Sequence, residues 1–378
     1  SQRHVWTTFS DDQVDLNYAN PRVMLDMIDT LLQYSRRGGR IIRLDAIAYL
    51  WKTLNTSCIH LPQTHATVRL MRRVLDLAAP GTLVLTETNV PHAENISYLG
   101  DGTNAAHMVY QFSLPPLLLE AVHSGDTTLL QRWMADLRPP SHSTTFFNFT
   151  ASHDGIGVRP LEGLVPDERL NVLVQAVRSG GGRVNTRRRA DGTDSPYELN
   201  ITYRDAVARP GISRSQHAAR FLATQAIMLT LQGIPAVYFH SLVGSPNDID
   251  GMLSSGQNRR INRHKYQRDD LDRAISTSGL QQDIFRGYCH LLDKRKGLPA
   301  LHPAADQRLI ASDVPGLLMY QRTNETSGDT LLVLANLSEQ IIETPDGIFD
   351  GTRRDQLTDE NVNGSVPLAP FQVRWLRS

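Results

Sequence analysis

Four residues near the ends of three apolar segments have side chains that can act together in chemistry. Arg43 and Asp45 lie two positions apart in one segment, so an extended chain projects both side chains to the same face. Glu87 ends a second segment, and Asp154 follows a third. If these segments are parallel strands of one sheet, their ends meet at one rim, and three carboxylates and an arginine lie there together.

Paired carboxylates at a sugar bond can provide one nucleophile and one proton donor. An arginine such as Arg43 would keep the first carboxylate, Asp45, ionised and oriented. Acidic residues at strand ends are also typical of helix N-caps and solvated loops. Spacing alone therefore leaves both interpretations open for all three carboxylates.

Short apolar segments that alternate with helical segments predict a parallel sheet. A helix is expected after Asn20, because Pro21 suits its first turn and Gly38 its end. Further helices are expected over about 64–79 and 213–232. The expected strands cover residues 41–46, 82–87, 107–112, 144–150 and 234–239. Such an α/β pattern fits a (β/α)8-barrel and an open doubly wound sheet equally well.

The sequence changes character after about Gly297. Three segments there have strand-like patterns separated by turn residues: 317–322, 330–335 and 371–376. We therefore expect a partial barrel domain over 1–297 and a small C-terminal all-β domain over 298–378. Residues 179–196, with three consecutive glycines and three consecutive arginines, are expected to form a long mobile loop.

The composition is that of a globular protein. The chain has 378 residues, of which 39 are basic and 39 acidic, so its formal net charge is zero. It lacks the positive field typical of proteins that bind nucleic acid or anionic membranes, and no apolar stretch is long enough to span a bilayer. Cys58 and Cys289 cannot build a disulfide scaffold and have no metal-ligand spacing. We expect a cytoplasmic protein with no metal site and no nucleic-acid or membrane partner.

Three sequence blocks carry a resemblance to a known family. They are Arg43-Leu-Asp-Ala46, Thr86-Glu-Thr-Asn89 and Ala151-Ser-His-Asp-Gly155, and each follows an expected strand. In this order they resemble characteristic blocks of the α-amylase superfamily, glycoside hydrolase family 13. The resemblance implies a (β/α)8-barrel of the α-amylase type.

Longer stretches narrow the resemblance. Residues 43–58, 147–157 and 259–264 are similar to the sucrose phosphorylase subfamily, and most of all to its glucosylglycerate phosphorylase branch. The similarity extends from about Val5 to the end of the chain. It implies retaining α-glucosyl transfer, with a small α-glucoside and inorganic phosphate as co-substrates and no cofactor.

The resemblance also implies roles for the three carboxylates. Asp45 matches the nucleophile that forms the β-glucosyl-enzyme, and Glu87 matches the general acid/base. Asp154 matches the carboxylate that binds sugar hydroxyls and favours the distorted transition state. A retaining mechanism needs the carboxyl groups of Asp45 and Glu87 about 5 Å apart. Glu87 must also be protonated at the first step, so we expect its surroundings to raise its pKa.

Further residues match substrate-binding positions of the family. Arg43 and His153 match the −1 subsite, and Arg259 matches a sugar-binding arginine. Phosphate replaces water as the acceptor in a phosphorylase, and this anion needs cations or N–H groups nearby. The loop with Arg187–Arg189 and Tyr197 is a candidate, because it resembles the subfamily's mobile phosphate and acceptor loop. A solvated basic loop is the alternative.

Two positions depart from the sucrose phosphorylase pattern. Glu198, a further substrate-binding candidate, stands where those enzymes carry Gln, and Arg260 stands where they carry Asp. Both changes alter the charge of the acceptor side, which argues against sucrose as the natural donor. We hypothesise that the extra cation suits an acidic acceptor such as glycerate.

The resemblance enters the family pattern just before its fourth barrel strand. A full barrel needs eight strands, whereas we expect only about five here, so the chain resembles the carboxyl-terminal part of an enzyme. The early strands would carry a further sugar-binding Asp and His. An open arc of strands would expose its edges and favour a homo-oligomer. We expect weak or absent activity from the chain as written.

Three functions are therefore open. The first is an α-glucoside phosphorylase acting on glucosylglycerate or a sucrose-like glucoside. The second is a retaining α-glucosidase or transglucosylase, which phosphate dependence would distinguish from the first. The third is a non-catalytic carbohydrate-binding fragment, in which a fluorinated glucosyl donor would leave Asp45 unlabelled.

Overall fold

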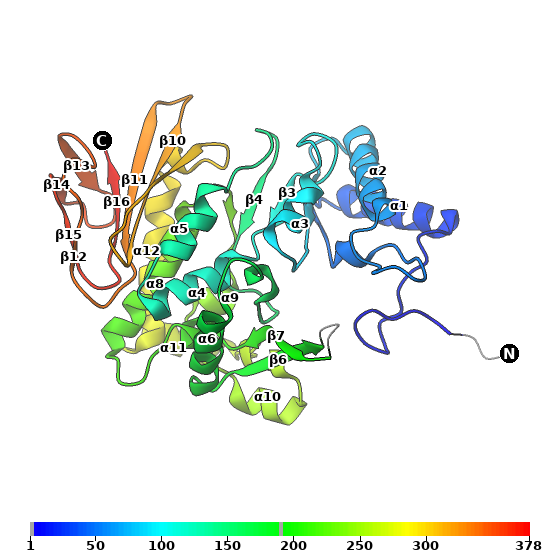
Figure 1. The fold of residues 1–378 in the computed structure, drawn as a ribbon, viewed down its shortest axis with the longest axis horizontal. Helices are drawn as coiled ribbons and strands as arrows, with labels where there is room; N and C mark the ends of the chain where they lie inside the picture. Colours follow the sequence, from blue (N-terminus) through cyan, green and yellow to red (C-terminus); the bar gives the residue numbers. More distant parts are fainter. Residues whose placement is uncertain (1–3, 189–191) are drawn as a thin grey trace. The chain divides into compact units, whose positions relative to one another are not determined.

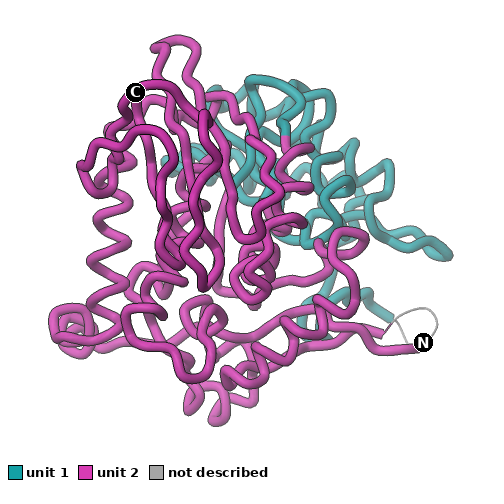
Figure 2. Tube along the Cα trace, turned by 60° about the vertical axis from the view of Figure 1, so that its left-hand side comes forward, with its two compact units in different colours: residues 1–110, 138–147 teal, residues 111–137, 148–378 magenta. Residues whose placement is uncertain are grey.

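The computed structural model describes residues 4–188 and 192–378 and separates the chain into two units. Unit 1 comprises residues 1–110 and 138–147, and unit 2 comprises residues 111–137 and 148–378 (Figure 2). Each unit is built from segments that are distant in the sequence.

Unit 1 contains a parallel sheet. Its strands are β1 (Ile41–Leu44), β2 (Leu83–Thr86), β3 (Met108–Tyr110) and β4 (Thr145–Asn148), adjacent in this order (Figure 1). Between them lie η1 (Ile47–Tyr49), α3 (His92–Ile96) and η2 (Ser97–Leu99). All four strands were predicted, because each is a short, mainly apolar run between turn residues. Most of these apolar residues are buried in the structure.

Two longer helices accompany this sheet, α1 (Pro21–Arg36) and α2 (Pro62–Ala78). The predicted start of α1 is confirmed, since the Asn20 side chain accepts a hydrogen bond from the Arg22 N–H. In α2, Val68, Met71 and Leu75 recur at helical spacing and are buried. α2 thus buries one apolar face, whereas in α1 only Leu31 is fully buried.

Unit 2 contains most of the helices. They are α4 (Leu114–Ser124), α5 (Thr128–Ala135), α6 (Asp167–Ser179), α7 (Tyr203–Ala206), α8 (Arg214–Thr230), α9 (Phe239–Leu242), α10 (Ile249–Ser255), α11 (Arg268–Ser276) and α12 (Leu280–Lys296), with the short turns η3 (Arg159–Leu161), η4 (Asn258–Asn262) and η5 (Pro299–Leu301). The predicted helix over 213–232 is α8, which Ser213 caps. Of the fifth predicted strand, 234–239, only β8 (Ile234–Pro235) is strand, because α9 begins at Phe239; the Ala236 N–H donates to the Asn148 carbonyl.

A three-stranded antiparallel sheet corrects one prediction. It consists of β5 (Ile156–Gly157), β7 (Asp194–Asn200) and β6 (Arg183–Arg188), with β7 in the middle. The predicted long loop over 179–196 is therefore wrong for the described residues. The strand β6 was missed because its sequence is polar and its residues are only half-buried or exposed, so no hydrophobic alternation marks it. Residues 189–191, with Arg189, lie outside the described part of the chain.

The C-terminal region is a β-structure, as predicted. Six strands are adjacent in the order β14 (Asn361–Asn363), β13 (Thr352–Asp355), β16 (Val373–Arg377), β11 (Asp329–Asn336), β10 (Leu317–Asn324) and β9 (Asp306–Ile310), and β12 (Ile342–Glu343) pairs with β15 (Pro367–Leu368). Leu317, Leu334 and Leu376 belong to its core. These strands begin after α12 but belong to unit 2, so the predicted domain boundary at 297 stays a prediction.

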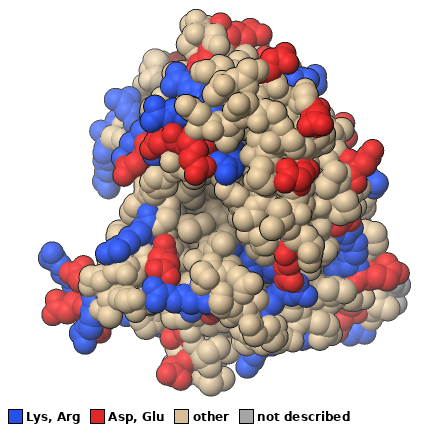
Figure 3. Space-filling view, turned by 90° about the vertical axis from the view of Figure 1, so that its left-hand side faces the viewer, with Lys and Arg blue, Asp and Glu red and all other residues tan. Residues whose placement is uncertain are grey.

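The surface carries charges of both signs. Figure 3 shows basic and acidic side chains interspersed over one face, in keeping with the zero net charge. Among the described helices, none has the length and apolarity needed to cross a membrane.

Candidate active site

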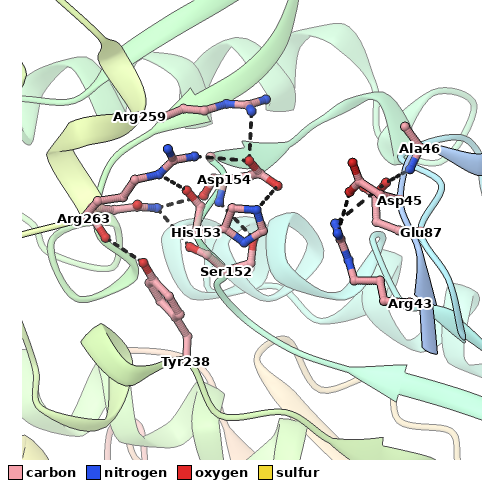
Figure 4. A network of polar contacts seen from close by, with 12 residues as sticks. Arg43, Asp45, Ala46, Glu87, Ser152, His153, Asp154, Tyr238, Arg259 and Arg263 are labelled. Atoms are coloured by element: carbon pink, nitrogen blue, oxygen red, sulfur yellow. Dashed lines mark hydrogen bonds and ion pairs between the residues drawn. The ribbon is translucent and has the colours of Figure 1, made fainter. Parts of the chain in front are cut away.

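In unit 1, strand β1 directs Arg43 toward two carboxylates. The Arg43 Nη1 lies 2.5 Å from the Asp45 Oδ1, and its Nη2 lies 4.0 Å from the Glu87 Oε2 (Figure 4). Asp45 follows β1 directly, and Glu87 follows the neighbouring strand β2. The two carboxyl groups therefore share one guanidinium, an arrangement compatible with the close spacing that retaining glycosidases need.

The turn after β1 holds Glu87 in place. The Glu87 N–H donates to the Leu44 carbonyl at 3.0 Å, and the Ala46 N–H donates to the Glu87 Oε2 at 2.8 Å. Ala46 has a φ of 46°, a left-handed conformation that ends the extended path of β1. The Glu87 side chain is only 13% exposed, whereas that of Asp45 is 72% exposed.

The surroundings of Arg43 keep it charged. Burial disfavours the guanidinium charge, but the carboxylates of Asp45 and Glu87 outweigh this effect, so the pKa of Arg43 lies above its ordinary value. The guanidinium also lies 5.5 Å from the centre of the Tyr110 ring. Unit 1 thus presents an accessible carboxylate beside a shielded one, with a permanent positive charge between them.

In unit 2, Asp154 is the centre of a second network. Its Oδ1 lies 2.8 Å from the Arg259 Nη1 and 3.4 Å from the Arg263 Nη2, and its Oδ2 lies 3.4 Å from the His153 Nε2 (Figure 4). Its backbone is fixed as well, because the Asp154 N–H donates to the Ser152 Oγ and the Asn262 Nδ2 donates to the Asp154 carbonyl. The carboxylate is therefore held from several sides.

Arg259 connects Asp154 to a buried carboxylate. Its Nε and Nη2 donate to the two oxygens of Glu198 at 3.1 and 2.8 Å. The Glu198 side chain is 3% exposed, and that of Arg259 is 44% exposed. Burial opposes the charge of Arg259, but its bonds to Glu198 and the charge of Asp154 outweigh this and raise the pKa of Arg259.

The remaining predicted residues lie around the β6–β7 pair and the η4 turn. Tyr197 lies on β7, where its carbonyl accepts from the Val158 N–H. Arg187, on β6, forms an ion pair with Glu162. Arg260 lies 3.5 Å from Asp248. Glu198 and Arg260, the two charges expected to differ from sucrose phosphorylases, thus both have internal partners.

Our sequence reasoning missed two residues of the second network, Asn262 and Arg263. Both lie in the block 259–264 that carried part of the resemblance, and Arg263 is four positions after Arg259. In a helical turn, this spacing places two side chains on one side, which was the available signal. The structure confirms that they share Asp154, although η4 is only one short turn.

The predicted site residues thus fall into two groups. Arg43, Asp45 and Glu87 are together in unit 1, and His153, Asp154, Glu198 and Arg259 are together in unit 2. Their convergence on one sugar ring stays a prediction. In the described part of the chain, no cluster of three His, Cys, Asp or Glu side chains is arranged to hold a metal ion.

Comparisons with known proteins agree with this picture. The family model of the alpha-amylase catalytic domain matches residues 1–154. The chain is 42% identical to the glucosylglycerate phosphorylase of Escherichia coli (strain K12) over 379 residues, which cover 100% of this chain and 67% of the relative. It is 49% identical to the glucosylglycerate phosphorylase of Allomeiothermus silvanus over 314 residues, 82% of this chain and 56% of that protein. The chain therefore spans 67% of the length of the first relative and 56% of the length of the second.

A solved structure shows the same fold. It is the crystal structure of sucrose 6F-phosphate phosphorylase from Thermoanaerobacter thermosaccharolyticum, with a TM-score of 0.73 at 22% identity over 88% of this chain and 64% of that one. The later strands of an α-amylase-type barrel, followed by an all-β region, account for the architecture. From its sequence blocks, its relatives and its fold, the chain belongs to the α-amylase family, glycoside hydrolase family 13, in its sucrose-phosphorylase-like group.

Proposed function

We propose that this chain carries the catalytic residues of a retaining α-glucoside phosphorylase, whose reaction converts glucosylglycerate and inorganic phosphate to glucose 1-phosphate and glycerate. One observation carries the proposal: in a chain 42% identical to a glucosylglycerate phosphorylase, Asp45 and Glu87 flank one guanidinium. This is the carboxylate pair that retaining glucosyl transfer requires.

In the first step, the Asp45 carboxylate attacks the anomeric carbon of the donor. The glycosidic C–O bond breaks, and Glu87 gives its proton to the leaving oxygen, so glycerate departs and a β-glucosyl ester of Asp45 remains. The exposure of Asp45 supports the first role, because a nucleophile must reach the substrate. The position of Glu87 supports the second role, because it approaches the same guanidinium that pairs with Asp45 and is 13% exposed.

In the second step, a phosphate oxygen attacks the anomeric carbon from the opposite face. The ester bond to Asp45 breaks, and the Glu87 carboxylate accepts the proton of the incoming phosphate. Two inversions restore the α configuration, so the product is α-glucose 1-phosphate. Arg43 favours the first step because its charge, 2.5 Å from the Asp45 Oδ1, stabilises the ionised carboxylate that attacks.

For Asp154 we propose the binding of sugar hydroxyls, as the family motif implies. The support from unit 2 is that its carboxylate is oriented by Arg259 and Arg263. A carboxylate fixed in this way can accept hydrogen bonds from hydroxyls with little loss of entropy on binding. His153, whose ring reaches the other oxygen, would contribute to the same subsite.

The acidic acceptor remains the preferred co-substrate class. Arg260 lies 3.5 Å from Asp248 and its side chain is 23% exposed, so its guanidinium is only loosely paired. An acceptor carboxylate would find local positive charge there. The basic residue Arg187 on β6 is a further candidate for the phosphate, although Glu162 already pairs with it.

The test compares donors and acceptors directly. The rate of glucose 1-phosphate formation is measured with glucosylglycerate and with sucrose, with and without phosphate. We expect a weak, phosphate-dependent reaction with preference for glucosylglycerate, in the cytoplasmic setting expected from composition. Glucose release without phosphate would favour an α-glucosidase, and no labelling of Asp45 by a fluorinated glucosyl donor would favour a carbohydrate-binding role.

We further propose that copies of this chain associate through unit 1. Among the described strands, β1 pairs only with β2 and so presents an edge. Leu25 on α1, Ile41 on β1 and Leu77 on α2 are 65%, 45% and 68% exposed, which leaves apolar surface on unit 1. Light scattering during gel filtration should give a mass above 42.2 kDa. A monomer at all concentrations would contradict this proposal and leave the catalytic one intact.

A further inference from the structure

We propose that Glu198 is a positioning residue that holds the guanidinium of Arg259 in the orientation that pairs with Asp154. This inference rests on the proposed function only in the role it gives to Asp154. It replaces our expectation that Glu198 itself contacts substrate, because the side chain is 3% exposed.

Each of the three nitrogens of the Arg259 guanidinium has a carboxylate partner. Nε and Nη2 donate to Glu198, and Nη1 lies 2.8 Å from the Asp154 Oδ1. A bidentate pair fixes the plane of a guanidinium, which a single hydrogen bond cannot do. Because the Arg259 side chain is 44% exposed, its surroundings alone do not immobilise it, and the buried carboxylate supplies the restraint.

The contacts of Glu198 require a carboxylate rather than an amide. Its Oε1 accepts from the Gly155 N–H at 3.1 Å and from the Arg259 Nη2, and its Oε2 accepts from the Asn185 Nδ2 at 3.1 Å and from the Arg259 Nε. Both oxygens thus face two N–H donors. A glutamine would place its NH2 group against two of these donors in either orientation, since it has only one acceptor oxygen.

Asn185, which donates to the Glu198 Oε2, has a second hydrogen-bond partner. The carboxylate of Glu198 can only accept, so Asn185 turns its Nδ2 toward it, and the Asn185 Oδ1 accepts from the Asn258 Nδ2 at 2.7 Å. Asn258 is the residue before Arg259 on η4, whereas Asn185 lies on β6 and Glu198 on β7. Glu198, Asn185 and Arg259 together form what we call the clamp. It joins the strands β6 and β7 to the turn η4, which carries Arg259.

Gly155 connects the clamp to Asp154 by a second route. It follows Asp154 directly, and a Cβ at this position would lie 2.5 Å from the Glu198 Cγ. Such a distance is far inside van der Waals contact, so only glycine lets the backbone approach this closely. Glu198 thus holds both the residue next to Asp154 and the arginine paired with its carboxylate.

The kinetic test uses Glu198→Gln, with Glu120→Gln as a matched control. Glu120 is also a buried carboxylate of unit 2, 3% exposed, and it pairs with Arg169 rather than with the Asp154 network. We expect Glu198→Gln to lower kcat for phosphorolysis by about tenfold to hundredfold, as for other small misplacements of site groups. Glu120→Gln should leave kcat within about twofold, although both variants should lower the melting temperature.

A double-mutant cycle separates positioning from general destabilisation. If Glu198 acts through Arg259, Glu198→Gln should have little further effect on kcat in an Arg259→Leu background. An equal loss in both backgrounds would overturn the inference. So would an unchanged kcat in Glu198→Gln.

A measurement without turnover keeps the inference separate from the proposed function. In nitrogen NMR spectra of the whole chain, the Arg259 Nε–H should exchange slowly with water in the wild type and in Asp154→Asn, and fast in Glu198→Gln. Equal protection in all three would overturn the clamp. If the wild type shows no turnover but the exchange pattern is as expected, the clamp stands and the proposed function fails.

Discussion

The carboxylates of the two networks are held in opposite ways. In unit 1, Asp45 has a single ion pair with Arg43 and is 72% exposed. In unit 2, Glu198 is 3% exposed and accepts four hydrogen bonds, and Asp154 has an ion pair with Arg259 and a further one with Arg263. Both networks contain arginine and carboxylate, yet Asp45 is 72% exposed, whereas Asp154 is 25% exposed and Glu198 3% exposed.

This difference indicates a division of work. A nucleophile has to form and break a bond in each cycle, so it needs access and few competing donors. A group that binds a sugar in one geometry, or that orients another group, is more effective when its own position is fixed. Removal of Asp45 or Glu87 should therefore lower the reaction rate more than the free energy of unfolding. Removal of a buried side chain in unit 2 whose donors and acceptors are all hydrogen-bonded should lower the free energy of unfolding.

The largest effect is expected for Asp45→Asn. It removes the nucleophile, so the rate of glucose 1-phosphate formation should fall by about 10⁴-fold. Because Asp45 is mostly exposed, the free energy of unfolding should change by less than about 0.5 kcal/mol. Asp26→Asn, on the exposed face of α1, is the matched control and should be fully active. A variant at position 45 that keeps a tenth of the rate would remove the distinction between the networks.

The second largest effect is expected for Glu87→Gln, which should lower the rate of glucose 1-phosphate formation from glucosylglycerate by about 10²–10⁴-fold. The loss should be at least about tenfold smaller with α-glucosyl fluoride, since fluoride leaves without a proton from the enzyme. Asp45→Asn should impair both donors alike, because both need the nucleophile. Rates with the two donors thus assign the two carboxylates, and equal losses for Glu87→Gln would argue against its role as the acid.

A smaller effect, on stability alone, is expected for Arg322→Met. Arg322 is fully buried and its guanidinium donates to four backbone carbonyls, those of Thr230, His302, Ala305 and Asp306. Its loss leaves these acceptors unsatisfied and should lower the free energy of unfolding by about 3 kcal/mol. The rate per folded molecule should not change.

Urea unfolding measures this prediction, with Arg308→Met as the control. Arg308 lies on the neighbouring strand β9 and is exposed. If both changes lower the free energy of unfolding equally, the hydrogen bonds of the buried Arg322 do not contribute more to stability than an exposed arginine does.

The smallest effect concerns pH and His107 in unit 1. Burial, with help from the charge of Arg72, lowers the pKa of His107 to about 4 from 6.5. Its Nδ1 accepts a hydrogen bond from the Val84 N–H at 3.0 Å, which requires the neutral ring. Between pH 6.5 and 4, the unfolded chain binds a proton that the folded chain does not, so stability is present at neutral pH and is lost as the pH falls.

His107→Asn should reduce that loss, because an amide oxygen can accept the same bond without titrating. The difference in unfolding free energy between pH 7 and pH 5 should shrink by about 1 kcal/mol or less, since solvent screens the partly exposed ring. Unfolding midpoints at the two pH values measure it, and exposed His142 replaced by Asn is the control. An unchanged pH dependence would assign the acid sensitivity to other groups.

The sequence alone determined the elements that have a strong local signal. The four strands of the unit 1 sheet and β8 were expected, because short apolar runs between turn residues are a pattern of neighbouring residues. The blocks around Asp45, Glu87 and Asp154 also identified the family before any geometry was available. Strand β6 escaped because a polar strand has no such pattern.

Only the tertiary structure decided which polar groups are partners. The Ala46 N–H meets Glu87 across 41 residues of chain, and Arg259 meets Glu198 across 61. Such pairs leave no periodic trace in the sequence, because each depends on how distant strands and turns pack. For the same reason Glu198 looked like a substrate ligand by its position in a motif. Its burial against Arg259, Gly155 and Asn185 is the observation from which we propose that it holds its neighbours.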